Sequence, residues 1–347
     1  MMQVLNMETV KQQLTMPMAI EAIEQLLIRQ TEHPNWVKTP ERLVIPTNKD
    51  SDTHQQGSHL SMPSVVFDGE QEYAVVKLVT ICPDNPQRQK PTTVATITVS
   101  DTATGDTLAF MDGIYVTQVR TAALSGVATK YLANPESQTV AVIGTGGMAY
   151  EQLNAVLTVC PNIRQVNLWN RSGDKAQQFK AQFIADYPQW AQQGISVKVC
   201  ESIEAAVAEA DVINLATRAT QGLFEIEQIK PNAHINAVGA YQPHMKEVSY
   251  SVIAACDYVV IDDLEGGKHE AGDLIQADDN ADCDWGWDEL SGQLMDLVNG
   301  KLQLSDEQAK SKLSLFKSVG AASFDAAVAL KIAQLAKRDG LGQAVAL

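Results

Sequence analysis

The chain has 347 residues and a formal net charge of −16, and 45% of its residues are hydrophobic. This composition is typical of a globular protein of about two domains. Nucleic acids and anionic membrane surfaces bind basic stripes, which so acidic a chain does not offer. The N-terminus has no signal-peptide pattern, no apolar run approaches the length of a membrane span, and the 5 cysteines are scattered. We therefore expect a cytoplasmic protein with reduced thiols that binds neither nucleic acid nor membranes.

The first third of the chain predicts a sheet flanked by helices. Residues 16–30 carry apolar side chains at helical spacing. Strand-like segments separated by turn residues follow, as in an antiparallel sheet, at 64–68, 72–81, 93–101 and 107–113. A second helix is expected over 117–133, with Thr117 as its N-cap. This pattern indicates an α+β domain.

Strands and helices alternate after residue 135. The strand-like segments lie at 139–143, 165–169, 196–200, 211–217, 234–239 and 258–262. Such alternation requires crossover connections and indicates a parallel, doubly wound sheet of the Rossmann type, so the fold class is α/β. A last helix, 323–338, lies beyond this pattern, and we expect it to return to the first domain.

A glycine-rich turn opens the Rossmann-type region. The segment from Gly144 to Ala149 fits GxGxxG/A directly after a strand and before a helix. Gly144 permits the tight turn, and Gly146 lets the backbone approach a pyrophosphate at the helix N-terminus. We therefore predict that a dinucleotide binds at Gly144, Gly146, Gly147 and Met148.

The end of the second strand of this region indicates which dinucleotide. NAD sites usually place a carboxylate here to bind the ribose 2′-hydroxyl. This chain has Asn170, Arg171 and Ser172 instead. A guanidinium and a hydroxyl without a repelling carboxylate suit a 2′-phosphate. We expect NADP(H) to be preferred, with NAD(H) possible.

Several segments together resemble the ornithine cyclodeaminase/mu-crystallin family. They include VKLVTICPDNP (76–86), VRTAALSGVATKYLA (119–133), VVIDDLEGGKHEAGDL (259–274) and FKSVGAASFDAAVA (316–329). The resemblance implies a substrate-binding and dimerisation domain formed by 1–130 with 315–347, and a Rossmann NAD(P)-binding domain formed by 131–314. It also implies a homodimer and a substrate that is an α-amino, α-imino or α-keto acid.

The resemblance also assigns individual residues. Arg42, Lys77 and Arg120 correspond to the family's cationic substrate pocket, and such cations replace the water that a carboxylate loses on binding. The residues expected to face the cofactor are Thr121, Ala216, Thr217, Val238 and Ser318. His269 and Glu270 belong to the family pattern without ligand spacing for a metal, so no metal is expected.

Two positions depart from the cyclodeaminases of the family. Those enzymes carry an Asp where this chain has Tyr241 and a Glu where it has Leu60. Cyclising ornithine needs acid–base groups for several proton transfers, whereas reducing a preformed cyclic imine needs fewer. Tyr241 is a candidate to donate a proton or to fill space against the ring.

We therefore expect an NAD(P)H-dependent reductase of cyclic α-imino acids, either Δ1-pyrroline-2-carboxylate or Δ1-piperideine-2-carboxylate. Lys77, Arg120 and Tyr241 are its candidate catalytic residues. The alternatives are an ornithine cyclodeaminase, an alanine dehydrogenase, or a protein that binds NADPH without catalysis.

Overall fold

The computed structural model describes residues 1–346, which form two compact units. One unit comprises residues 1–120 together with 321–347, and the other comprises 121–320. The sequence placed the boundaries at residues 130 and 315 instead. Helix α3 (Gly113–Leu132) runs across the first boundary, and β15 (Ser314–Lys317) pairs with strands of the second unit.

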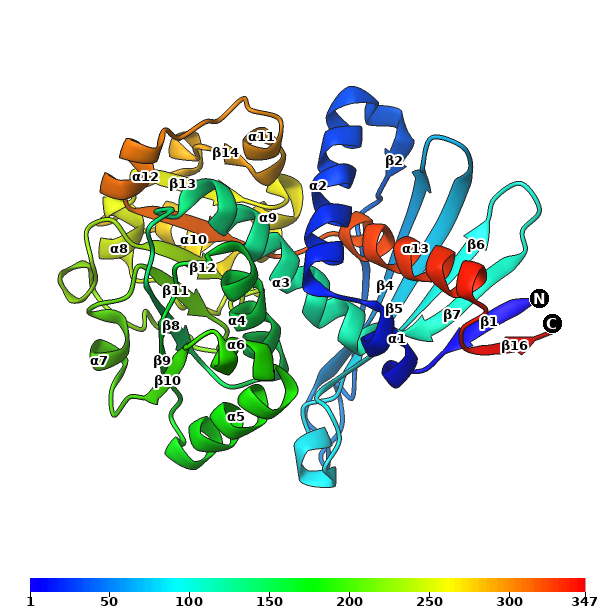
Figure 1. Ribbon diagram of the computed structural model, residues 1–347, viewed down its shortest axis with the longest axis horizontal. Coiled ribbons are helices and arrows are strands. Elements are labelled where there is room, and N and C mark those ends of the chain that lie inside the picture. Colours follow the sequence, from blue (N-terminus) through cyan, green and yellow to red (C-terminus); the bar gives the residue numbers. More distant parts are fainter. Residues whose placement is uncertain (347) are drawn as a thin grey trace. The chain divides into compact units, whose positions relative to one another are not determined.

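The first unit is a mixed sheet covered by helices on one face. Its strands follow the order β16-β1-β7-β6-β5-β4-β2, and β3 pairs with β4. Figure 1 shows the red C-terminal helix lying across the blue and cyan strands of this unit, against which it packs. The strands are β1 (Met2–Leu5), β2 (Val37–Lys38), β3 (Leu43–Thr47), β4 (Gly57–Phe67), β5 (Glu72–Ile81), β6 (Thr93–Asp101), β7 (Thr107–Asp112) and β16 (Gln343–Val345). The helices are α1 (Met7–Gln13), α2 (Met16–Glu32), the first part of α3, and α13 (Ala322–Asp339).

The second unit is a parallel sheet in the order β10-β9-β8-β11-β12-β15-β13-β14. Its strands are β8 (Thr139–Ile143), β9 (Gln165–Trp169), β10 (Ser196–Val199), β11 (Val212–Leu215), β12 (His234–Ala237), β13 (Tyr258–Ile261), β14 (Gly292–Gln293) and β15. Its helices are the rest of α3, α4 (Gly147–Val159), α5 (Gly173–Asp186), α6 (Pro188–Gln192), α7 (Ile203–Val207), α8 (Tyr250–Ala255), α9 (Leu264–Glu270), α10 (Gly272–Asp278), α11 (Leu294–Val298) and α12 (Asp306–Ser311). This is the Rossmann-type architecture that the alternation of strands and helices predicted.

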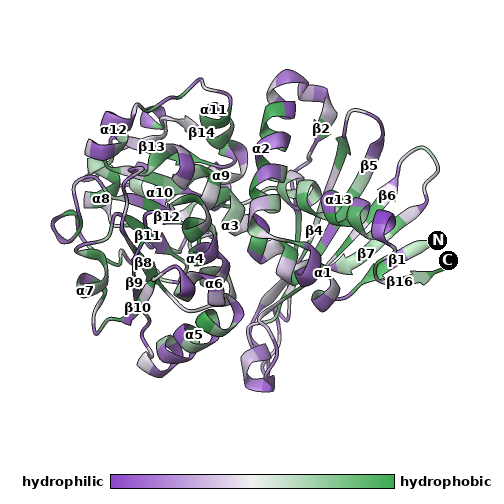
Figure 2. Ribbon diagram, viewed as in Figure 1, coloured by the Kyte–Doolittle hydropathy of each residue, from purple (hydrophilic) through white to green (hydrophobic). Residues whose placement is uncertain are grey.

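Burial follows the two kinds of sheet. In β8, Val140 to Ile143 are all buried, because a parallel sheet is covered on both faces. Figure 2 shows the strands of this sheet in predominantly hydrophobic colours. In β5 burial alternates, so that Val75, Lys77 and Val79 share the covered face. Of the described residues, none forms a helix long and apolar enough to cross a membrane.

Helix α3 begins earlier than the sequence suggested. The Asp112 side chain accepts a hydrogen bond from the Tyr115 backbone amide at 2.9 Å, as an N-cap does. Thr117 lies inside the helix, where its hydroxyl donates to the Gly113 carbonyl at 2.7 Å. The prediction of Thr117 as the N-cap was therefore wrong.

A buried ionic network fixes the strand ends of the second unit. Lys317, the last residue of β15, forms an ion pair with Asp273 of α10, and both side chains are fully buried. Asp273 also accepts from the backbone amides of Glu247 and Val248, at 2.5 and 3.0 Å. The Glu247 carboxylate in turn accepts from the Thr217 amide at 2.5 Å. The loops after β11 and β12 are thereby tied to α10 and to the end of β15.

Replacing Lys317 by Met is expected to lower the free energy of unfolding by about 3–5 kcal/mol, because it leaves a buried carboxylate without its counter-charge. Denaturant unfolding of both proteins measures the difference. Lys312→Met is the matched control, since Lys312 pairs with Asp257 at 2.8 Å on the surface, and such pairs contribute at most about 1 kcal/mol. Equal losses in the two variants would contradict the role given to the buried pair.

Candidate active site

A buried cluster of opposite charges lies in the first unit. Lys77 Nζ is 2.6 Å from Asp325 Oδ2, and Arg120 Nε is 2.9 Å from Asp325 Oδ1. The three side chains come from β5, α3 and α13, and they are 2%, 6% and 1% exposed for Lys77, Arg120 and Asp325. The structure therefore brings two of the predicted substrate-binding cations together around a carboxylate.

The charges of the cluster and its burial shift the pKa values of Lys77 and Asp325. Burial lowers the pKa of Lys77 to about 8, against the opposing effect of the Asp325 carboxylate. Burial favours the neutral form of Asp325, but the charges of Arg120 and Lys77 outweigh it and hold its pKa below the usual value. Arg42, the third predicted cation, lies close enough to lower the pKa of Lys77 further. Lys77 and Arg120 together carry two positive charges against the one negative charge of Asp325, and this excess suits an anionic substrate.

The glycine-rich turn has the geometry of a dinucleotide site. Gly144 has a φ of 106°, and a Cβ there would lie 2.7 Å from the Ala216 carbonyl oxygen. Gly146 is the N-cap of α4, and a Cβ on it would meet nothing within 4 Å. Gly147 and Met148 begin α4, so their amides belong to the helix N-terminus, where anions bind favourably. The turn therefore fits the pyrophosphate of a dinucleotide.

Thr121 of α3 is a further candidate for a contact with the cofactor. It is only 6% exposed, and its hydroxyl has no hydrogen-bond partner among the residues described. A buried hydroxyl without a partner is unusual unless a ligand or water binds it. This fits the expectation that Thr121 contacts the cofactor phosphates.

The segment after β9 forms a capped turn. Ser172 is the N-cap of α5, and its hydroxyl oxygen accepts from the Lys175 amide at 3.4 Å. The Asn170 amide donates to the Ser172 carbonyl at 3.1 Å. Arg171 is exposed between them. The guanidinium is therefore available to a ligand at the end of β9.

The remaining cofactor candidates gather at the carboxyl edge of the parallel sheet. The Gly144 amide donates to the Trp169 carbonyl at the end of β9. In the same way, the backbone amides of Ala216, Val238 and Ser318 donate to the last residues of β8, β11 and β12. Ligands of open parallel sheets bind at this edge. Tyr241 follows β12 and is partly buried, and burial raises its pKa above the ordinary value despite the charge of Arg218.

Two carboxylates hold this edge in place, and the sequence did not predict them. Glu247 accepts from the Thr217 hydroxyl at 2.7 Å and from the Gly239 amide at 2.7 Å, and burial raises its pKa to about 7. Asp262 accepts from the Ser318 hydroxyl at 2.7 Å and from the Gly320 amide at 2.8 Å. Asp325 in the first unit was missed as well. Each acts through partners distant in sequence, so no local spacing marks them.

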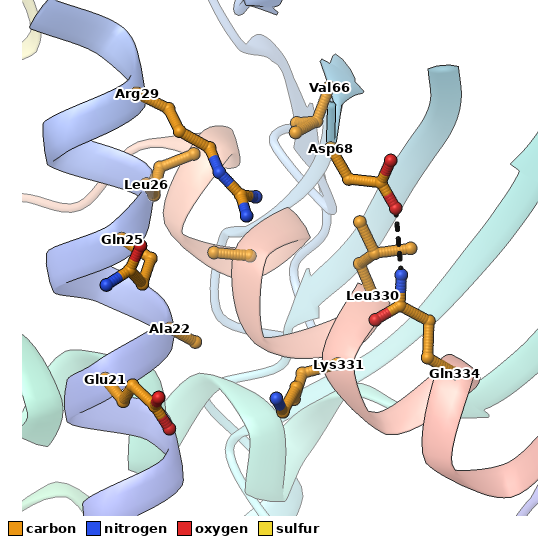
Figure 3. A pocket seen from close by; sticks show the side chains of 11 residues that line it. Glu21, Ala22, Gln25, Leu26, Arg29, Val66, Asp68, Leu330, Lys331 and Gln334 are labelled. Atoms are coloured by element: carbon orange, nitrogen blue, oxygen red, sulfur yellow. Dashed lines mark hydrogen bonds between the residues drawn. The ribbon is translucent and has the colours of Figure 1, made fainter. Parts of the chain in front are cut away.

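A separate cavity of about 180 Å³ lies between α2 and α13 in the first unit (Figure 3). Side chains of both signs line it, including Glu21 and Arg29 from α2 and Lys331 from α13. Gln334 donates to Asp68 across it at 3.0 Å, as the dashed line in Figure 3 marks. None of the predicted site residues lines this cavity. Within residues 1–346, no three His, Cys, Asp or Glu side chains are placed to hold a metal ion.

Comparison with known proteins finds relatives that match most of the chain. A Bacillus cereus protein named Delta(1)-pyrroline-2-carboxylate reductase is 33% identical over 315 residues, which cover 88% of this chain and 89% of the relative. The structure of Thermococcus litoralis Delta(1)-pyrroline-2-carboxylate reductase in complex with NADH and L-proline has a TM-score of 0.88 and 29% identity, covering 99% of this chain and 100% of that one. An archaeal alanine dehydrogenase dimer with bound NAD has a TM-score of 0.84 and 27% identity, covering 100% of this chain and 99% of that one.

The family model named "Ornithine cyclodeaminase/mu-crystallin family" matches residues 1–339. The match spans both units, from the first strand to the end of α13. The chain therefore belongs to the ornithine cyclodeaminase/mu-crystallin family.

Proposed function

We propose that this protein is an NAD(P)H-dependent reductase of cyclic α-imino acids, with Δ1-pyrroline-2-carboxylate or Δ1-piperideine-2-carboxylate as substrate. The observation that carries the proposal is the buried Lys77–Asp325–Arg120 cluster, which offers a cationic site for a small carboxylate. The names of the Bacillus and Thermococcus relatives support the substrate class.

The cationic cluster binds the carboxylate group of the substrate. The planar guanidinium groups of Arg120 and Arg42 suit a bidentate contact, and their charge replaces the hydration of the anion. Because Asp325 accepts from Arg120 Nε at 2.9 Å, the orientation of the guanidinium is set before substrate binds. A bound nicotinamide cofactor supplies the hydride for the carbon of the C=N bond.

The absence of two acids favours reduction over cyclisation. In the ladder between β4 and β5, Met62 pairs with Lys77 and Leu60 pairs with Val79. Residues two apart on a strand share a face, so Leu60 lies on the face that carries Lys77. A Glu at position 60 would bring a carboxylate to this face, whereas leucine offers no acid–base group. The proton transfers needed to cyclise ornithine lack their groups here.

The enzymatic test follows loss of NADPH absorbance with each cyclic imino acid, with ornithine plus NAD and pyruvate plus ammonia as opposing substrates. We expect rapid oxidation of NADPH with an imino acid and no ammonia release from ornithine. Proline and ammonia from ornithine would establish a cyclodeaminase instead. Binding of NADPH without turnover of any imino acid would favour the non-catalytic alternative.

We further propose that NADP(H) is preferred over NAD(H). The support is the exposed Arg171 on the capped turn after β9, where an NAD site would carry a carboxylate. The Asn170–Ser172 contact at 3.1 Å shapes the same turn. The relatives of known structure contain NADH and NAD, which supports a nicotinamide cofactor. The preference for the 2′-phosphate of NADP(H) rests on the residues of this chain alone.

Replacing Arg171 by Ala is expected to weaken NADPH binding by about 1.5–3 kcal/mol, because a charge-assisted contact with the 2′-phosphate is lost. NADH binding should change little. Fluorescence titration of the two cofactors measures both affinities, and Lys180→Ala on α5 is a charge-matched control. Equal weakening of NADPH and NADH binding would contradict the assignment of Arg171 to the 2′-phosphate.

We also propose a homodimer formed through the outer face of the first unit's sheet. Leu78, Val94 and Phe110 are 41%, 41% and 37% exposed. Their partners in the ladders, Leu78 with Thr96, Val94 with Thr80 and Phe110 with Thr98, place all three on the same face. An apolar sheet face of this kind is typical of an interface, and the archaeal alanine dehydrogenase is named a dimer.

Replacing Leu78 and Val94 together by Asp is expected to produce a monomer, because two charges would have to be buried in the interface. Light scattering coupled to size exclusion measures the mass. Ile184→Asp on α5, where the side chain is 36% exposed, is the control and should leave the dimer intact. A wild type that is monomeric, or a double variant that stays dimeric, would contradict the proposed interface.

A further inference from the structure

The cavity between α2 and α13 has a size and a charge pattern that the proposed reductase site does not use. Its volume of about 180 Å³ exceeds the roughly 150 Å³ of a cavity that holds a benzene molecule. We propose that this cavity binds a small α-amino acid with an apolar side chain, as a zwitterion, at a site separate from the cationic cluster. The inference goes beyond the reductase function and does not depend on it, because it concerns binding alone.

Two cations reach toward this cavity from opposite helices. Figure 3 shows the side chain of Arg29 extending from α2 and that of Lys331 extending from α13 toward the space between the helices. Both residues are partly buried. Within residues 1–346, neither the guanidinium nor the ammonium group forms an ion pair or a hydrogen bond. In a chain with 42 acidic and 26 basic residues, two such cations at one cavity indicate that their partner is the carboxylate of a ligand.

Acidic side chains at the same cavity favour a zwitterion over a plain anion. Glu21 of α2 and Asp68, which follows β4, line the cavity together with the two cations. The Asp68 carboxylate already accepts from the amides of Glu70 and Gln71 and from the Gln334 side chain. The Glu21 carboxylate has no partner in the described part of the chain and is available to an ammonium group. Two charges of each sign sum to zero, so a neutral ligand that carries both signs fits this lining best.

The wall between these charges is apolar. Leu26 of α2, Val66 of β4 and Leu330 of α13 line the cavity and are 3%, 2% and 6% exposed. Ala22 and Ala327 line it as well, and their small side chains leave room that a larger residue would fill. Ligand sites combine apolar walls of this kind with a few polar groups that fix the orientation of the ligand. The wall therefore selects α-amino acids with apolar side chains.

The cavity and the cationic cluster share one helix. The α13 helix carries Asp325, which pairs with Lys77 and Arg120, and it also carries Lys331. A helix rises by about 1.5 Å per residue, so Lys331 lies about 9 Å along the axis from Asp325. None of the residues of the cluster lines the cavity. A ligand between Arg29 and Lys331 therefore joins α2 to α13 without occupying the cluster, and it should raise the Tm of the protein.

The first test is calorimetric titration of the wild type with L-valine and its two truncated analogues. Isovalerate lacks the ammonium group of valine, and isobutylamine lacks its carboxylate. We expect one L-valine to bind per chain and each analogue to bind at least about tenfold more weakly, because each loses a charge-assisted contact. Saturating pyrrole-2-carboxylate, a planar carboxylate suited to the cationic cluster, should leave the affinity for L-valine unchanged.

Two results of these titrations would overturn the proposal. The absence of binding at millimolar L-valine would show that the cavity is not an amino-acid site. Displacement of L-valine by pyrrole-2-carboxylate would place the amino acid in the cationic cluster instead. A wild type that binds L-valine as expected and reduces no cyclic imino acid would contradict the reductase function and leave this site standing.

The second test removes the charges of the cavity one at a time. Arg29→Gln, Lys331→Gln and Glu21→Gln should each weaken L-valine binding by about tenfold, because each removes one ionic partner of the zwitterion. The matched controls are Lys337→Gln on α13 and Glu32→Gln on α2, two exposed residues that do not line the cavity. Both controls should bind L-valine as the wild type does. Equal affinities in Lys331→Gln and Lys337→Gln would overturn the assignment of the ligand's carboxylate.

The third test fills the cavity and keeps its four charges. Ala22→Phe places an aromatic ring where the apolar side chain of the ligand would lie, so both L-valine binding and the rise in Tm should be lost. Its basal kcat with a cyclic imino acid should not change, since Ala22 belongs to no part of the cationic cluster. Binding that persists in Ala22→Phe would show that surface charges hold the ligand outside the cavity. Circular dichroism reports whether the variant is folded, and if it is not, the charge variants decide the question.

Discussion

The carboxylate of Asp325 is the group on which the cationic cluster of the first unit depends. Two cations buried as deeply as Lys77 and Arg120 would be very costly without a counter-charge, since desolvation of each ion costs several kcal/mol. Asp325 lies on α13, far along the chain from β5 and α3. The last helix must therefore return to the first unit for the cationic cluster to exist. The discontinuous first unit is thus a consequence of the site's electrostatics as well as of packing.

The second unit uses buried carboxylates in a different way. Glu247 and Asp262 accept hydrogen bonds from backbone amides and hydroxyls at the carboxyl edge of the parallel sheet. A carboxylate that accepts several hydrogen bonds restricts the loops that carry the donors, because each bond limits the movement of its loop. Asp273 of α10, which is paired with Lys317 at the end of β15, accepts from the Glu247 backbone amide. Buried charges therefore help to hold the loops at the carboxyl edge of this sheet.

The sequence predicted the parts of this protein that local patterns determine. Strands β8 to β13 of the parallel sheet, the glycine turn at Gly144 and the amphipathic α2 follow from spacing and composition, whereas β14 and β15 of the same sheet were not predicted. The prediction of Thr117 as a helix cap failed because Asp112, which caps α3, ends a strand and was assigned to it. Asp325 looked like any polar residue of an amphipathic helix, since its partners Lys77 and Arg120 are distant in sequence. Only the fold shows which charges are buried together.

The same arrangement explains how one scaffold can serve several reactions of α-amino and α-imino acids. Under the proposed function the cationic cluster binds a carboxylate, a group that all of these substrates share, so it carries little information about the reaction. The reaction is decided by which other groups transfer protons. At Leu60 and Tyr241 this chain has no carboxylate, and the acidity of Tyr241 is reduced further by burial. The absence of acids at these two positions suits the reduction of a preformed imine better than the expulsion of ammonia, which needs more proton transfers.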